Sequence, residues 1–423
     1  MNASATLPST QSVRPGPKGP SLLGQLRRVE RRKRLRAMAL TLPLLIFLAV
    51  TFLVPLGALL VRAVENPEVA STLGRTGEAL KHWDRKSAPP DQAYAAILED
   101  LGAIPETAQA GVLARRLNTE IAGARSLVMA TYRALPLAQV QSPAQAREAL
   151  LALDARWGEL PYWWAIAKNS SRWTPDYLLT SLDLKRDAQG NIVRVGADEA
   201  AFSEILVRTF YISSVVTLVC IALGYPLAYW LSTLSARRAN LMMILVLLPF
   251  WTSVLVRIAA WIVLLQSSGL VNRFLMFIGL TSEPIALLFN RLGVIIAMVH
   301  ILLPFMVLPL YSVMKSIPGN YVKAAVSLGS PPFTAFLRVY VPQTFPGVAA
   351  GGLLVFITAI GYYVTPALLG GPGDQMLSYY VAQYTNVEVN WGMACALGSV
   401  LLSATLVLYV FYRRFAKAEL SLS

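Results

Sequence analysis

The stretch YVKAAVSLGSPPFTAFLRVYVPQTFP, residues 321–346, lies between two long apolar runs and decides how the chain is interpreted. Asn320 is suited to cap a short helix, and Gly329 followed by Ser330 predicts the end of that helix. Two prolines, at 331 and 332, suit the first turn of a second helix. Apolar residues recur at helical spacing in this second helix, at Phe333, Phe336, Leu337, Tyr340 and Val341. The pattern predicts a helix–turn–helix that offers an apolar face to a soluble partner.

The order and spacing of residues in this stretch resemble the "EAA" loop of bacterial ABC importer permeases. That loop reads E-A-A, a Gly six residues after the Glu, and I-x-L-P beyond the Gly. The resemblance implies that this segment is a coupling helix that inserts into a groove of the ATPase subunit, through Lys323, Ala324, Ala325, Gly329 and Pro342. Lys323 departs from the family pattern. With Asn320 as N-cap it is the third helical residue, where a Glu would close a capping box and a Lys cannot.

The composition is that of a membrane protein, because 55% of the residues are hydrophobic and only 14% are charged. The formal net charge is +14, yet 18 of the 23 acidic residues lie in the segment 63–204. Most basic residues outside that segment fall in loops expected to be cytoplasmic. The excess is therefore the positive-inside bias of a membrane protein and does not indicate nucleic-acid binding. Cys220 and Cys395 lie in apolar runs and predict neither a disulfide nor a metal site.

Apolar runs of about 20 residues predict about six membrane-spanning helices. We expect them at 38–61, 205–234 (broken near Pro226), 241–265, 292–314, 347–369 and 391–412. Residues 1–36 form a basic tail that we expect to be cytoplasmic and to contact anionic lipid, and 413–423 form a second cytoplasmic tail. Both termini are then inside and the segment 63–204 is outside, which predicts a multi-pass protein of the bacterial inner membrane.

The segment 63–204 contains no long apolar run, so we expect an aqueous, mostly helical insertion in the periplasm. Helical patterns cover 92–101, 106–135 and 144–157, and 185–195 is typical of a hairpin or a loop around Gly190. Tyr162, Trp163, Trp164 and Trp173 are aromatic enough for a small core or an interface. Two interpretations stay open. The insertion contacts a partner that delivers the solute, or it is a helical cap packed on the membrane part.

The resemblance extends over about 205–412 and the first span. Its motifs are Gly224-Tyr225-Pro226, 248–252 with Arg257, 301–311 (ILLPFMVLPLY) and 369–372. These motifs resemble those of the spermidine/putrescine-type permeases, and in particular the first of the two permease subunits in such a system. The resemblance implies the all-α, type I ABC importer permease fold. It also implies a second permease in a heterodimer, a dimer of ATPase subunits that holds ATP and Mg, and a periplasmic solute-binding protein. The insertion departs from the shorter members of the family.

Polar and aromatic residues inside the predicted spans are candidates for the transport pathway, because such residues are costly in a membrane. They are Trp251, Thr252, Arg257, His300, Tyr362, Tyr363 and Thr365. Arg257 either lies near mid-membrane or extends to the outer surface. The aromatic residues are interpreted either as a gate for a cationic solute or as ordinary packing residues.

No Asp or Glu lies inside a predicted span, so a cationic solute has no buried counter-charge in this chain. Selectivity is then expected to come from the binding protein, the second permease, the aromatic residues or the external acids Glu283, Asp374 and Glu388.

No phosphate-binding loop of the G-x-x-x-x-G-K-[ST] type is present, and no catalytic constellation or metal cluster is visible. The sequence thus predicts a permease rather than an enzyme, with no cofactor in this chain. It is expected to translocate a small solute, such as putrescine, spermidine or a related amine, while a separate subunit hydrolyses ATP. The alternatives are an ion-coupled secondary transporter or channel, and a passive scaffold or receptor whose function lies in the insertion.

Overall fold

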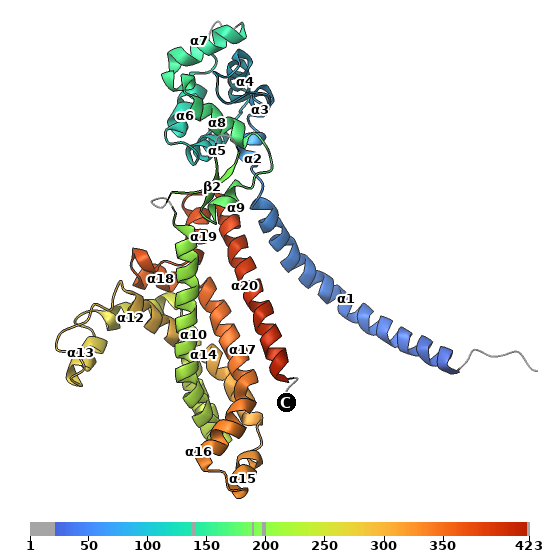
Figure 1. Cartoon of the computed structure of the whole chain (residues 1–423), viewed down its shortest axis with the longest axis vertical. Helices are drawn as coiled ribbons and strands as arrows, with labels where there is room; N and C mark the ends of the chain where they lie inside the picture. The colour runs from blue at the N-terminus through green and yellow to red at the C-terminus, as the bar shows by residue number, and fades with distance from the viewer. Residues whose placement is uncertain (1–21, 138–140, 188–189, 197–199, 421–423) are drawn as a thin grey trace, which may run out of the picture. The chain divides into compact units, whose positions relative to one another are not determined.

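The computed structural model of the chain describes residues 22–137, 141–187, 190–196 and 200–420 (Figure 1). It divides into two units, 1–58 and 59–423. The helix α1 runs from Leu22 to Arg62, and its apolar part, Thr41–Arg62, is long enough to cross a membrane. The helix therefore begins inside the stretch predicted as a basic tail. Arginine is a good helix former, so the Arg-rich turns before the span continue it. Residues 1–21 lie outside the described part.

The insertion consists of short helices and one small hairpin. Its elements are α2 (Pro67–Ala70), α3 (Gly74–Ala79), α4 (Asp91–Gly102), α5 (Thr107–Asn118), α6 (Ala124–Ala134), α7 (Pro143–Leu153), the 3₁₀ turn η1 (Ala155–Gly158), α8 (Leu160–Asn169), α9 (Asp176–Thr180), β1 (Leu184–Arg186) and β2 (Ile192–Arg194). The two strands pair antiparallel, with Lys185 opposite Val193, which confirms the hairpin predicted at 185–195. The single helix predicted at 106–135 is wrong, because Gly123, at φ +89°, separates α5 from α6.

The insertion has a hydrophobic core of its own, built around three aromatic residues. The rings of Tyr94 and Trp163 lie 4.6 Å apart and those of Trp157 and Trp163 lie 5.3 Å apart. Both indole nitrogens are satisfied, since Trp157 donates to the Thr131 hydroxyl and Trp163 donates to the Trp157 carbonyl. Trp163 thus confirms the predicted small core, whereas Trp173 is exposed.

The rest of the chain is helical. It contains α10 (Phe202–Thr233), α11 (Ala236–Leu247), the 3₁₀ turn η2 (Leu248–Trp251), α12 (Val254–Leu265), α13 (Leu270–Phe277), α14 (Arg291–Ser316), α15 (Asn320–Ser327), α16 (Pro332–Ala335), the π turn η3 (Phe336–Tyr340), α17 (Val341–Gly361), α18 (Val364–Leu369), the 3₁₀ turn η4 (Pro372–Asp374), α19 (Leu377–Asn386) and α20 (Trp391–Leu420). Within the described residues, five helices are long and apolar enough to span a membrane, and a bent pair makes a sixth candidate. The prediction of an all-α membrane protein is confirmed.

Three predicted spans differ from the structure in where they break. The third is not one straight helix, because Ala236–Trp251 and Val254–Leu265 meet at 97° beyond Pro249. The second was expected to break near Pro226, yet α10 continues through this proline. The fifth begins earlier than expected, since α16, η3 and α17 join into one span, Pro332–Gly361. It then ends at Gly361, and α18 follows after a two-residue break.

The helix α14 is the centre of the membrane bundle and contacts both α10 and α17. Met306 on α14 is fully buried between glycines of these two neighbours. A Cβ atom on Gly224 would come within 2.8 Å of Met306 Cγ, and one on Gly351 within 3.0 Å of the Met306 carbonyl oxygen. The three backbones therefore approach closely where small residues meet, which is how helices commonly pack in membranes.

This packing predicts unequal effects for two adjacent substitutions. Gly351→Ala places its methyl group against the Met306 backbone and is expected to destabilise the protein by about 1–3 kcal/mol. The control is Gly352→Ala, whose nearest neighbour would be Ile221 Cδ1 at 3.8 Å, so we expect little change. Both substitutions raise helix propensity equally, so a difference between them reports packing. The measurement is the melting temperature of each purified protein in detergent. Equal melting temperatures would contradict the packing argument.

The insertion packs on the end of the bundle formed by α19 and α20. Tyr177 of α9 shares a buried cluster with Leu377 and Met393, and its ring lies against the backbone of Gly392. A Cβ atom at position 392 would stand 2.4 Å from the ring, so this contact needs a glycine. The opposite end of the bundle carries α15 and α16 (Figure 1).

Candidate functional site

The first candidate site is the tip formed by α15 and α16, at the end of the bundle away from the insertion (Figure 1). The helix α15 ends in a Schellman motif, in which the amide of Ser330 donates to the Ala325 carbonyl and the amide of Gly329 donates to the Val326 carbonyl. Gly329 has φ +93°. This left-handed conformation strains other residues, so glycine sets the sharp turn. The predicted end of the first helix is confirmed.

The predicted start of this helix is wrong. Gly319 is the N-cap, and Asn320 is already the first helical residue, with no side-chain bond to the helix end. Lys323 is consequently the fourth helical residue rather than the third. The capping-box comparison with a Glu at this position therefore does not apply. A turn precedes α15, in which the Tyr321 amide donates to the Pro318 carbonyl at 3.3 Å.

The predicted apolar face of the second helix is divided between two environments. Phe336 and Tyr340 pack inward, and the ring of Tyr229 lies 5.2 Å and 5.5 Å from theirs. Phe333 and Leu337 remain exposed. Together with Tyr321, Val326 and Leu328 they form the exposed apolar set of the tip. Leu328 is 89% exposed and Phe333 is 72% exposed, which is unusual for such large apolar side chains at a prominent turn.

The second candidate site is a polar cluster within the bundle, close to the bend in the α11–α12 pair. Trp261 of α12 donates its Nε1–H to Nδ1 of His300 on α14, at 3.2 Å. Arg257 lies one turn before Trp261, on the same face of α12. Trp261 and Tyr362 pack against the same cluster of buried apolar residues. Arg257 Nε is buried and has no hydrogen-bond partner among the described residues.

The structure brings together some of the predicted pathway residues and not others. Tyr362 lies in the break between α17 and α18, where its carbonyl accepts a hydrogen bond from the Ser378 hydroxyl at 3.0 Å. Thr365, on α18, is fully buried. By contrast, Trp251 and Tyr363 are exposed on the surface of this chain, and the Thr252 hydroxyl bonds the nearby Pro249 carbonyl. No described contact links these three to the cluster.

The sequence reasoning missed Trp261, which orients the His300 ring. Its spacing of four residues from Arg257 on an apolar helix was the available signal. The partner across the cluster was not visible, because 39 residues separate Trp261 from His300 in the chain.

A buried polar network joins the helices of the insertion. The Arg116 guanidinium donates to Asn66 Oδ1 at 3.2 Å, to Asn169 Oδ1 at 2.6 Å and to Glu120 Oε1 at 3.0 Å. Its plane also lies over the Tyr177 ring, 5.0 Å from the centroid. Burial by itself would raise the pKa of Glu120, but the charges of Arg116 and Lys168 outweigh it and hold that pKa below its usual value. The network therefore keeps Glu120 ionised inside the insertion.

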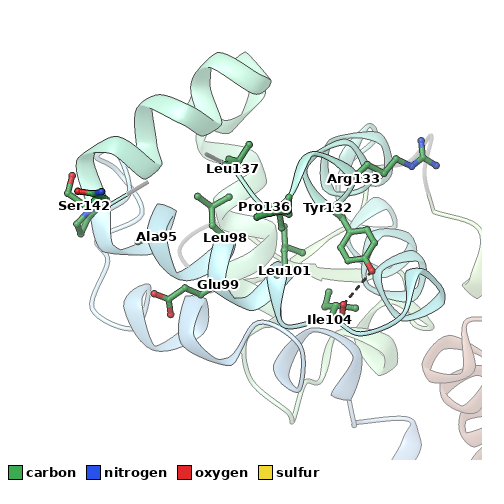
Figure 2. A pocket seen from close by; sticks show the side chains of 14 residues that line it. Ala95, Leu98, Glu99, Leu101, Ile104, Tyr132, Arg133, Pro136, Leu137 and Ser142 are labelled. Carbon is green, nitrogen blue, oxygen red and sulfur yellow. Dashed lines mark hydrogen bonds between the residues drawn. The ribbon is translucent and has the colours of Figure 1, made fainter. Parts of the chain in front are cut away.

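A cavity of about 780 Å³ opens in the insertion between α4, α6 and the start of α7 (Figure 2). Leu98, Leu101 and Pro136 line it, and the Tyr132 hydroxyl donates to the Ile104 carbonyl at 3.4 Å. Figure 2 shows Arg133 extending away from the two leucines. Polar side chains do not converge on this cavity as they do in specific ligand sites. Throughout the described residues, no three His, Cys, Asp or Glu side chains are placed to hold a metal ion.

Comparison with known proteins identifies the family. Residues 220–419 match the family described as binding-protein-dependent transport system inner membrane component. The spermidine/putrescine transport system permease protein PotB of Haemophilus influenzae is 36% identical over 214 residues, which cover 50% of this chain and 74% of that protein. PotB of Escherichia coli is 35% identical over the same length, covering 78% of that protein.

Among solved structures, a bacterial ABC transporter involved in the import of the acidic polysaccharide alginate is similar, with 19% identity and a TM-score of 0.44 over 51% of this chain and 79% of that one. The match to the family and the identity to PotB place the membrane part of the chain among the transport proteins. The chain belongs to the binding-protein-dependent inner membrane components, and is a multi-pass permease of an ABC importer.

Proposed function

We propose that this permease translocates a small amine-bearing solute of the putrescine and spermidine kind, which a periplasmic binding protein delivers. The similarity to two PotB proteins supports the solute class. ATP hydrolysis takes place in a separate pair of ATPase subunits, and a second permease completes the transmembrane part. The insertion lies in the periplasm and both termini lie in the cytoplasm, in agreement with the basic residues at the α11 start and around the tip.

The observation that carries this proposal is the exposed apolar tip. A turn that holds Leu328 and Phe333 in water has an unfavourable free energy unless another protein covers them. The Schellman motif at Gly329 gives this turn a defined shape, so the tip fits a preformed groove. The second half of the tip is continuous with the span Pro332–Gly361. A push on the tip by a closing ATPase pair therefore reaches the membrane bundle without an intervening flexible linker.

The polar cluster is the proposed pathway surface of this chain. His300 lies nine residues after Arg291, about 14 Å along α14 at 1.5 Å per residue. The His300 side chain is exposed, although α14 is the most buried of the candidate spans. An exposed histidine at that depth faces water or another protein subunit rather than lipid. Trp261 bonds this histidine, and Arg257 lies one turn before Trp261 on α12, so we take this face to border the route of the solute.

The test is co-purification of the full chain with its neighbouring gene products in mild detergent, followed by ATPase measurements. We expect an ATPase subunit to co-purify, and its activity to rise when the binding protein and a transported amine are added. The variant Gly329→Val strains the left-handed turn, so we expect normal membrane insertion with loss of the ATPase subunit. Gly319→Ala is the matched control, because Gly319 has open space around it and an ordinary helical φ of −61°. If the wild-type chain transports solute in ATP-depleted vesicles under an ion gradient, the chain is an ion-coupled transporter instead.

A further inference from the structure

We infer that a small cavity at the start of α20 receives a side chain of the periplasmic binding protein when that protein docks. This inference rests on the proposed function and deepens it, because it names the surface on which the solute is delivered. Several exposed residues line or adjoin the cavity, and we call them the seam patch. They are Val112 and Arg115 of α5, and Val387, Glu388, Val389 and Trp391 at the junction of α19 and α20.

The cavity lies where the insertion meets the membrane bundle, and its volume is about 190 Å³. The insertion contributes lining residues from α2, α5 and α9, and the bundle contributes residues 388–391. The buried ring of Tyr177 lines the cavity, is covered by the Arg116 guanidinium at 5.0 Å, and also packs against Gly392. The cavity is therefore continuous with the interface that joins the insertion to α20.

Large apolar side chains are exposed on both sides of this cavity. Val112 represents the insertion, and Val389 and Trp391 represent the bundle. Val387 adjoins them and is 71% exposed. Apolar residues gathered in one place on a surface mark an interaction site more often than scattered ones do. A tryptophan beside a pocket is also typical of the residues that contribute most to binding between proteins.

The loop between α19 and α20 has a defined and strained shape. Val389 has φ +55°, a left-handed conformation that is unfavourable for a β-branched residue. Hydrogen bonds on both sides maintain it, since the Glu388 amide donates to the Gln383 carbonyl at 3.1 Å and the Asn390 amide donates to the Tyr384 carbonyl at 2.8 Å. Strain of this kind is concentrated at functional sites. A loop that is already ordered also binds a partner at a lower cost in entropy.

The charges around the cavity favour a protein as its occupant. Arg116 and Glu68 line the cavity and each has an ion-pair partner in the chain. Arg115 and Glu388 are exposed and form no ion pair among the described residues. Exposed charges beside exposed apolar residues are the arrangement of a protein interface, which has an apolar centre and a polar rim.

Other occupants match this surface less well. Lipid acyl chains leave Arg115 and Glu388 without partners, and a free diamine carries only positive charge and is repelled by Arg115. The family to which this chain belongs depends on a binding protein. Charge complementarity then requires that protein to place an acidic group opposite Arg115 and a basic group opposite Glu388.

The experiment titrates the complete importer, reconstituted in lipid nanodiscs, with its own binding protein loaded with putrescine or spermidine, and measures ATPase activity. Val389→Asn removes the apolar side chain and retains a residue that tolerates the left-handed conformation. We expect the half-saturating concentration of binding protein to rise roughly tenfold, with an unchanged maximal rate. Glu388→Lys is expected to raise it as well, and more strongly at low ionic strength. Val193→Asn is the matched control, because Val193 is an exposed valine of β2 that does not line the cavity.

A photo-reactive amino acid at position 389 provides an independent readout, and we expect it to crosslink to the added binding protein. Crosslinking to lipid alone would overturn the inference, as would half-saturating concentrations that both Val389→Asn and Glu388→Lys leave unchanged. Binding of radiolabelled putrescine without the binding protein, abolished by Glu388→Lys, would instead make the cavity a solute site and would also overturn it. In each of these cases the proposed function stands. If the binding protein does not stimulate the wild-type importer with either amine, the proposed function fails and this inference fails with it.

Discussion

Leu328→Asp is expected to weaken the binding of the ATPase subunit by roughly 30-fold or more while the permease still inserts in the membrane. Leu328 is the most exposed apolar side chain of the tip and follows the last residue of α15. Burying a leucine in a partner's groove contributes about 1.5–3 kcal/mol. A carboxylate there also has to be desolvated, and hot-spot substitutions commonly cost about 2–4 kcal/mol. The measurement is the amount of ATPase subunit that co-purifies with a tagged permease.

Asn320→Asp is the matched control for this prediction. It introduces the same negative charge into α15, but at an exposed polar position and at the helix N-terminus, where a negative charge is favourable. We expect normal recovery of the ATPase subunit with this variant. If both variants bind the ATPase equally well, the exposed leucine does not contribute to the docking surface, and the tip loses its proposed role.

Arg116→Met is expected to destabilise the insertion by about 3–5 kcal/mol, the usual effect of removing one partner of a buried ion pair. The side chains of Arg116 and Glu120 are 6% and 18% exposed, so solvent screens their interaction little. Without Arg116, Glu120 retains Lys168 at 2.8 Å, while Asn169 loses a donor to its Oδ1. Arg115→Met is the control, because Arg115 is the adjacent residue and is exposed. Hydrogen exchange of α5 and α8 in the purified full chain measures the difference.

The same pair predicts a pH dependence. The pKa of Glu120 is lowered in the folded protein, so its ionised form stabilises the fold. This contribution is fully present above the unfolded pKa of about 4.3 and is lost as the pH falls through the lower folded value. In Arg116→Met the folded pKa of Glu120 rises, because burial remains and one cation is gone. We expect protection of α5 to decline at a higher pH in this variant than in the wild type. Identical pH profiles would show that Arg116 does not set the ionisation of Glu120.

Local patterns in the sequence predicted the elements that depend on composition and turn chemistry. The spans at 292–314 and 391–412 correspond to α14 and α20, because a long apolar run can be satisfied in a membrane only as a helix. The turn at Gly329 is where it was expected. These features follow from neighbours in sequence, so no knowledge of packing was needed.

The helix boundaries that were predicted wrongly have a common cause. Pro226 was expected to break α10, but neighbouring helices support the backbone around a membrane proline. Pro249 does accompany a break, with a bend of 97°. Each proline removes one backbone hydrogen bond of its own helix, and the surrounding packing decides which helix continues. Gly123, at φ +89°, divides the helix expected at 106–135, and both resulting helices contribute residues to the insertion core.

The sequence by itself determined that this chain is an all-α membrane protein with a helix–turn–helix between two spans and with a small set of polar residues inside its spans. These properties follow from hydropathy and residue spacing, which are local. Only the tertiary structure decided that Trp261 of α12 meets His300 of α14, and that Trp251 and Tyr363 are exposed. Beyond the bend that follows Pro249, α12 contacts α14 and α18, and these contacts join residues far apart in the chain.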